Sequence, residues 1–348
     1  MATFSRRLLD PCRSSLSKAA LQPEVQGSPH DIFRRVSSLL WPTLLCTEDK
    51  LYERQNDTER AEVKIPIQPL TITYQEALKL MPWQMDNPHI HTGYRRPTGS
   101  IRACISSIFG YIHNESGNIL THLTGAIGFM IILINHLSTS TLGRSSSIDM
   151  LEFVPMAVYL CSAISCLGMS TAFHTLNSHS KKISDRAHRC DYAGILLLAV
   201  GTILPVIYYA FHGDVYWQLI HSAVIILAGS ITAYVVLCRR YRAKRILRTT
   251  TFFVLGCSVL IPLYHFTMTR GYAYAKTTIG IDKMIVSGFL YALGTGIYTS
   301  RFPERLYPGR FDIFCSSHQI FHTLVVMATL CQYLALKSII DVKWVSAD

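Results

Sequence analysis

The chain has 348 residues, of which 49% are hydrophobic and only 16% are charged. About a quarter of the residues in a soluble domain are charged, so this composition excludes an ordinary soluble protein and favours long membrane-spanning segments. The formal net charge is +11, but the Lys and Arg residues stand in short runs between hydrophobic segments. That placement is typical of membrane orientation, and we expect no nucleic-acid partner.

The first third of the chain contains two polar regions. Residues 1–65 lack a sustained hydrophobic period, so we predict a disordered cytosolic tail there. Residues 66–112 are predicted to form a cytosolic juxtamembrane region, with a short helix over residues 74–80 and a turn rich in Pro, Trp and Asn over residues 82–88.

Seven apolar segments follow in residues 113–340, which we predict to be one transmembrane domain. Each is close to the roughly 20 residues that cross a bilayer as a helix. The predicted fold class is therefore all-α, a seven-transmembrane helix bundle. The segments are residues 118–136, 151–175, 191–211, 215–238, 249–269, 279–299 and 314–336.

The basic residues predict the orientation of this bundle. They are concentrated before the first segment and after the second, fourth and sixth, with six between Arg239 and Arg248. The positive-inside rule then places the N-terminus in the cytosol and the C-terminus in the extracellular or lumenal space. Residues 345–348 are no retention signal, so the plasma membrane and the endomembranes (ER or Golgi) both remain open as locations of this multi-pass protein.

This topology brings three histidines to the predicted cytosolic end of the bundle. His174 ends the second segment, and His318 and His322 begin the seventh. Residues four apart lie on one face of a helix, so the last two histidines can join His174 around one ion. Three neutral imidazoles suit Zn²⁺ and leave a fourth position for water, which is the pattern of catalytic zinc.

Two further residues fall in the same layer and are candidate catalytic groups. Asp191 begins the third segment, where it could hold a water molecule and act as general base. Ser170 is one turn before His174, where its hydroxyl could orient a ligand or donate to an oxyanion. Simpler interpretations remain open: Asp191 could be a terminal acid favoured by the helix dipole, and Ser170 could be a packing hydroxyl.

Several motifs in this order resemble the progestin and adipoQ receptor (PAQR) family, which includes the adiponectin receptors and haemolysin III-related proteins. The resemblance covers about residues 80–340. The matching motifs are Asp86–Arg95, His113–His122, Ser170–His174, Asp191–Gly194, Phe302–Asp312 and Ser316–His322.

The resemblance implies a seven-helix fold with a cytosolic N-terminus and zinc held by His174, His318 and His322. It implies that Asp191 contacts the zinc-bound water and that Ser170 is the serine of an S-x-x-x-H motif. It further implies that Glu115, Asn118 and His122 support the site or the fold. These three lie in the matching motif His113–His122.

Two functions remain open at this point. One is a ceramidase-like zinc hydrolase, since the family is related to alkaline ceramidases. It would cleave ceramide-like amides, with a sphingolipid or fatty acid in the bundle cavity, and would be linked to lipid-metabolic signalling and an extracellular ligand. The other is a receptor or scaffold in which the zinc is structural and no hydrolysis occurs. Zinc transport is less favoured, because the polar groups cluster at one depth.

Overall fold

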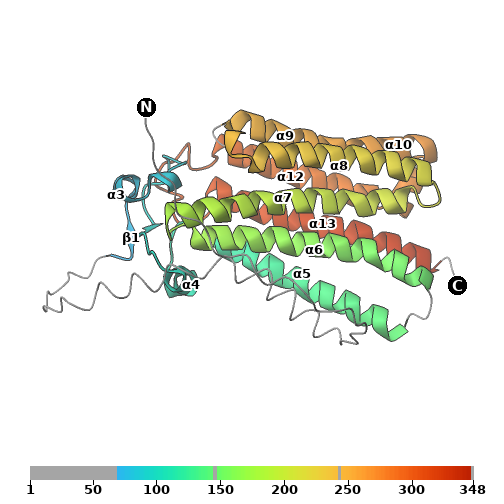
Figure 1. Ribbon diagram of the computed structural model, residues 1–348, viewed down its shortest axis with the longest axis horizontal. Coiled ribbons are helices and arrows are strands. Elements are labelled where there is room, and N and C mark those ends of the chain that lie inside the picture. Colours follow the sequence, from blue (N-terminus) through green and yellow to red (C-terminus); the bar gives the residue numbers. More distant parts are fainter. Residues whose placement is uncertain (1–68, 144–146, 242–243, 346–348) are drawn as a thin grey trace, which may run out of the picture. The chain divides into compact units, whose positions relative to one another are not determined.

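The computed structural model describes residues 69–143, 147–241 and 244–345, and most of them are helical. Long helices run side by side, as Figure 1 shows. This agrees with the predicted all-α membrane bundle. The predicted disordered tail, residues 1–65, lies outside the described residues.

All seven predicted apolar segments form helices. In chain order these are α5 (Ser116–Gly143), α6 (Ser147–Leu176), α7 (Lys181–Ala210), α8 (Val215–Leu237), the pair α9 (Arg245–Ser258) and α10 (Leu260–Arg270), α12 (Ile281–Ser300) and α13 (Ser317–Val345). A short helix that the sequence pattern did not predict, α11 (Tyr272–Thr278), precedes α12.

Within the described residues, six helical stretches are long and apolar enough to cross a membrane. They lie in α5, α6, α7, α8, the α9–α10 pair and α13. The seventh helix, α12, carries Asp282 and Lys283 in its first turn and packs extensively against α13. The chain is therefore an integral, multi-pass membrane protein, while the sidedness of its termini stays a prediction.

The start of the third segment differs from the prediction. Helix α7 begins at Lys181, ten residues before Asp191, and Ser180 caps it by accepting a hydrogen bond from the Ile183 backbone N–H at 3.5 Å. The apolar run marks only the part of a helix that suits hydrocarbon, and polar residues continue this helix beyond it. Asp191 is therefore three turns inside the helix, where the dipole of the N-terminus no longer favours an acid.

The core is built around α13, which packs against α5, α6, α7 and α12. Two polar contacts supplement its apolar packing. The Tyr159 hydroxyl on α6 donates to the backbone carbonyl of Thr329, and the Ser287 hydroxyl on α12 donates to the carbonyl of Ala328 at 2.8 Å. Such contacts satisfy polar groups where lipid offers no hydrogen-bond partner.

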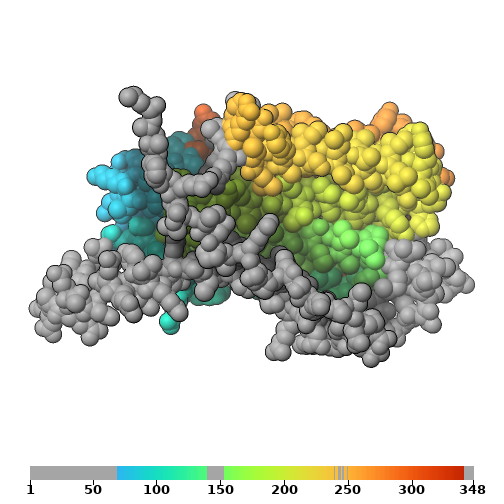
Figure 2. All heavy atoms as spheres, viewed as in Figure 1, coloured from blue at the N-terminus to red at the C-terminus, as the bar shows by residue number. Residues whose placement is uncertain are grey.

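The juxtamembrane segment forms a small folded layer at one end of the helices, drawn in blue in Figure 2. The predicted helix over residues 74–80 is α3 (Tyr74–Leu80), with a Thr73–Glu76 capping box. The other elements are η3 (Pro82–Gln84), α4 (Ile101–Gly110), and the antiparallel strands β1 (Thr71–Ile72) and β2 (Tyr94–Arg95). Helix α4 was not predicted, because its polar buried side and exposed apolar side match neither a soluble helix nor a membrane span.

Candidate metal centre

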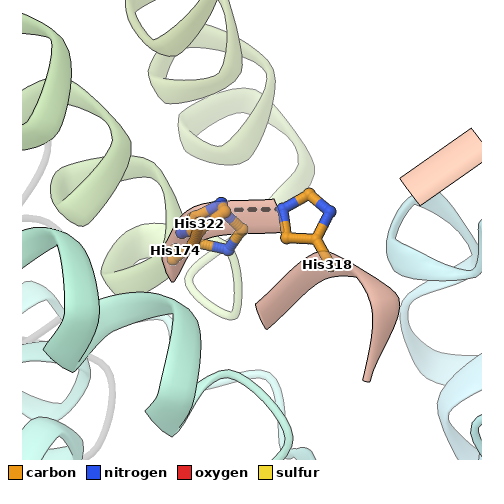
Figure 3. Close-up of side chains that lie close together, drawn as sticks. All are labelled: His174, His318 and His322. Atoms are coloured by element: carbon orange, nitrogen blue, oxygen red, sulfur yellow. Dashed lines mark hydrogen bonds between the residues drawn. The ribbon is translucent and has the colours of Figure 1, made fainter. Parts of the chain in front are cut away.

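The three histidines converge at one end of the bundle, from α6 and α13 (Figure 3). His174, His318 and His322 each offer one ring nitrogen, and these nitrogens lie within 4.8 Å of one another. The Nε2 atoms of His174 and His318 face each other at 3.3 Å. His174 and His322 are buried and His318 is half-buried.

Glu115, just before α5, holds His174 in place. Its Oε2 atom accepts a hydrogen bond from His174 Nδ1 at 2.7 Å, and Asn118 Nδ2 donates to the same oxygen at 2.7 Å. With the proton on Nδ1, the lone pair of His174 Nε2 points toward the other histidines. This arrangement of carboxylate, imidazole and open nitrogen is typical of zinc ligands.

The charge state of Glu115 suits this role. Burial alone would raise the pKa of the Glu115 carboxyl, but the hydrogen bonds from His174 and Asn118 and the nearby charge of Arg95 hold that pKa well below its usual range. Its neighbour His113 is neutral, because burial and the charge of Arg95 lower the pKa of His113 to about 4. The His113 Nδ1 atom accordingly accepts a hydrogen bond from the Glu115 backbone N–H at 3.2 Å.

His322 is oriented by α5 as well. Its Nδ1 atom lies 3.3 Å from the backbone carbonyl oxygen of Asn118. A carbonyl oxygen only accepts, so Nδ1 carries the proton and Nε2 keeps its lone pair. The His122 ring stacks on His322, with centroids 3.8 Å apart. The motif that contains Glu115, Asn118 and His122 therefore surrounds two of the three histidines.

Arg95 on β2 fastens the juxtamembrane layer to the end of α6. Its side chain is buried and donates to the backbone carbonyls of His174 and Thr175 and to the Ser107 hydroxyl. These carbonyls belong to the last turn of α6, where a helix has no backbone N–H groups left to pair with its carbonyl oxygens. Sequence reasoning counted Arg95 only as a positive charge, although it ends one of the matching motifs.

The loop before α13 positions His318. Glu304 is buried and accepts hydrogen bonds from the Ser317 backbone N–H at 2.8 Å, from the Ser317 hydroxyl and from Asn87 Nδ2 at 3.0 Å. An acid at this place satisfies free N–H groups of the helix start and complements its dipole. The matching motif Phe302–Asp312 thus has a structural role beside the centre.

The two predicted catalytic groups also lie at this end. Asp191 on α7 is close to both His174 and the Ser170 side chain, and Ser170 is buried on the turn of α6 before His174. The structure therefore places Asp191 and Ser170 beside His174, while their catalytic roles stay predictions. By contrast, His221 and His265 form a separate pair, with Nε2 and Nδ1 2.9 Å apart.

The donor set fits zinc. Three imidazole nitrogens lie close to one point, and a carboxylate and a carbonyl oxygen fix the required tautomer in two of the three rings. The nitrogens of His174 and His318 that face each other at 3.3 Å would repel without a proton or a cation between them. A divalent ion satisfies all three at once.

Comparison with known proteins gives a consistent family. Residues 110–333 match the model for "Haemolysin-III related" proteins. The chain is 38% identical to the adiponectin receptor protein of Drosophila melanogaster, over 72% of this chain and 56% of that relative. It is 32% identical to progestin and adipoQ receptor-like protein 1 of Caenorhabditis elegans, over 87% of this chain and 72% of that protein. Heptahelical transmembrane protein 1 of Arabidopsis thaliana is 31% identical, over 76% and 80% respectively.

Proposed function

The chain belongs to the haemolysin-III related family of membrane proteins, and from this premise and its histidine centre we propose that it is a zinc-dependent intramembrane amidohydrolase acting on ceramide-like lipids. The observation that carries the proposal is the tautomer of His174. Glu115 accepts a hydrogen bond from His174 Nδ1–H, so Nε2 keeps the lone pair that would bind the ion. Zinc with three protein ligands and one open position activates water and polarises a carbonyl.

Residues of the chain would transfer the proton and orient the groups of the site. Asp191, close to His174, accepts a proton from the attacking water and returns it to the amide nitrogen as the C–N bond breaks. Ser170 lies beside Asp191 and orients its carboxylate through the hydroxyl. Glu115 and the Asn118 carbonyl keep two imidazoles in place. The products are a fatty acid and a sphingoid amine.

The location of the centre favours a lipid substrate. His174 lies in the last turn of α6, and His318 and His322 lie in the first turns of α13. We infer that this end of the bundle lies at the depth where a membrane lipid presents its polar linkage. A ceramide-like lipid has its amide at that level and its chains in the hydrocarbon. The released lipid products would link this protein to lipid-metabolic signalling, and an extracellular ligand would regulate their release. The protein would act at the plasma membrane or in the endomembranes.

The test is fatty-acid release from ceramides by the purified protein in detergent. We expect release that requires zinc and is lost in Asp191→Asn and His318→Ala. Matched controls are Asp282→Asn, at the start of α12, and His212→Ala, which follows α7; both should retain activity. Activity that persists in Asp191→Asn would contradict the assigned proton transfer.

One outcome would favour the alternative function. If the protein contains zinc, releases no fatty acid, and loses thermal stability when the zinc is removed, the metal is structural. It would then tie α6 to α13 in a receptor or scaffold, and partners of the cytosolic region would be the next object of study.

A further inference from the structure

A second polar site lies beside the histidine centre, between α7, the end of α8 and the start of α9. It is a cavity of about 220 Å³. Pockets for drug-sized ligands usually measure about 300–1,000 Å³, so this smaller cavity suits a headgroup and not a whole lipid. Its polar lining residues are Asp185, His188, Arg189, Tyr192 and Arg248.

The cavity has a positive lining. Arg189 and Arg248 come from two different helices, and the acid in the lining, Asp185, is paired with Lys181 at 2.9 Å. The sequence around it strengthens this bias. Residues 181–189 hold four Lys and Arg, and residues 239–248 hold six, with Asp185 the only acid in either stretch. An anion is therefore the favoured occupant.

Aromatic stacking holds the lining in place. The His188 ring stacks on Phe173 and contacts the Tyr192 ring, with centroid distances of 4.6 Å and 4.4 Å. The Arg248 guanidinium lies over the Tyr192 ring, 5.6 Å from its centroid. Side chains ordered before binding lose less entropy when a ligand arrives, so this lining is organised as a binding site.

The apolar wall indicates where the ligand comes from. Val236 and Leu237, the last residues of α8, complete the cavity, and Leu237 is exposed on the outside of the bundle. A lipid could place its polar group between the arginines and its chains along α8. The positive-inside prediction puts this end in the cytosolic leaflet, which contains the anionic phospholipids.

We propose that this cavity binds the phosphorylated headgroup of an anionic membrane lipid, of the phosphoinositide class. Guanidinium groups bind phosphate oxygens with paired hydrogen bonds, which ammonium groups cannot match. Basic pockets between transmembrane helices on the cytosolic side are suited to such headgroups. The inference is independent of hydrolysis, since none of the lining residues belongs to the histidine centre.

A lipid bound in this cavity would be coupled to the histidine centre through neighbouring residues. The His188 ring on α7 contacts Phe173 of α6 and Tyr192, one turn further along α7. Phe173 directly precedes His174, and Tyr192 directly follows Asp191. A headgroup bound against this stack would therefore also restrain the parts of α6 and α7 that carry His174 and Asp191.

The test uses the full-length protein in phosphatidylcholine nanodiscs, with and without phosphatidylinositol bisphosphate, and native mass spectrometry to count bound lipid. We expect the phosphoinositide to bind, and affinity to fall about five-fold for each arginine lost in Arg189→Gln and Arg248→Gln. The lysine variants of these residues should give smaller losses, because they keep the charge and lose the paired hydrogen bonds.

The matched control is the double variant Arg186→Gln and Arg240→Gln, two exposed basic residues of the same two basic stretches that lie outside the cavity lining. It should bind like the unmodified protein. Equal losses in control and cavity variants would overturn the proposal in favour of diffuse surface attraction. Binding of inorganic phosphate or soluble inositol trisphosphate as tightly as the lipid would overturn the lipid origin of the ligand. Failure to bind the phosphoinositide at all would overturn the site.

Discussion

Glu115 provides the sharpest test of how the histidine centre is built. Its carboxylate accepts from His174 Nδ1 at 2.7 Å and is itself held by Asn118 at 2.7 Å. Groups that orient a zinc ligand in this way typically contribute 10–100-fold in metal affinity. In Glu115→Gln, the amide oxygen can still accept from Nδ1, so only the charge is lost, and we expect a loss of about 10-fold, or ~1.4 kcal/mol.

Glu115→Ala removes the acceptor altogether. The buried His174 Nδ1 would then have no carboxylate to fix its tautomer, so we expect a loss of about 100-fold, or ~2.7 kcal/mol. The assay is a zinc titration in detergent against a chromophoric chelator, with protein of verified thermal stability. Glu76→Gln is the control, since this exposed acid bonds only within the Thr73 capping box of α3. Unchanged zinc affinity in a folded Glu115→Ala protein would refute the reasoning.

Three further predictions concern packing, anchoring and the metal. Gly194→Ala should destabilise the protein by about 1–3 kcal/mol, because the added Cβ would lie 2.9 Å from the backbone of Cys166. Thermal unfolding measures this loss, and Gly168→Ala is the control because there is open space where its Cβ would lie. Arg95→Ala should lower stability by on the order of 3 kcal/mol, because two buried carbonyls lose a charged donor, whereas the half-buried Arg96 should tolerate alanine. Chelation of the metal should lower the unfolding temperature, and zinc should restore it.

Each of these predictions has a result that contradicts it. A Gly194→Ala protein as stable as Gly168→Ala would mean that α6 and α7 can separate at no cost. Equal stability of the Arg95→Ala and Arg96→Ala proteins would show that the juxtamembrane layer does not hold the end of α6. An unfolding temperature that is unchanged by chelator and by added zinc would exclude a bound metal that stabilises the fold.

The helical membrane fold was predictable from local features of the chain. Runs of about 20 apolar residues identify helices wherever they occur, and all seven were found. The predictions that were wrong or missing also concerned local features, namely the start of one helix and the existence of another. Helix α7 starts at Lys181 because polar residues extend it beyond the apolar run, and hydropathy does not register such an extension. Helix α4 buries the polar Ser107 against Arg95 and exposes Phe109, the reverse of the pattern by which amphipathic helices are recognised.

The candidate metal ligands were also predictable, because residue spacing and the direction of each helix both point to the same three histidines. The spacing of His318 and His322 places them on one helix face, and the alternation of chain direction places His174 at the same end. These arguments need only residue counts, and the structure brings the three ring nitrogens together.

The sequence by itself therefore determined the helices, the family and the three imidazoles, since each depends on residues near one another or on recognisable motifs. Only the tertiary structure decided that Glu115 accepts a hydrogen bond from His174 Nδ1, that Arg95 holds the end of α6, and that Arg189 and Arg248 meet across one cavity. These pairs lie far apart in the chain. Their distances follow from how the helices cross and pack, which no local pattern encodes.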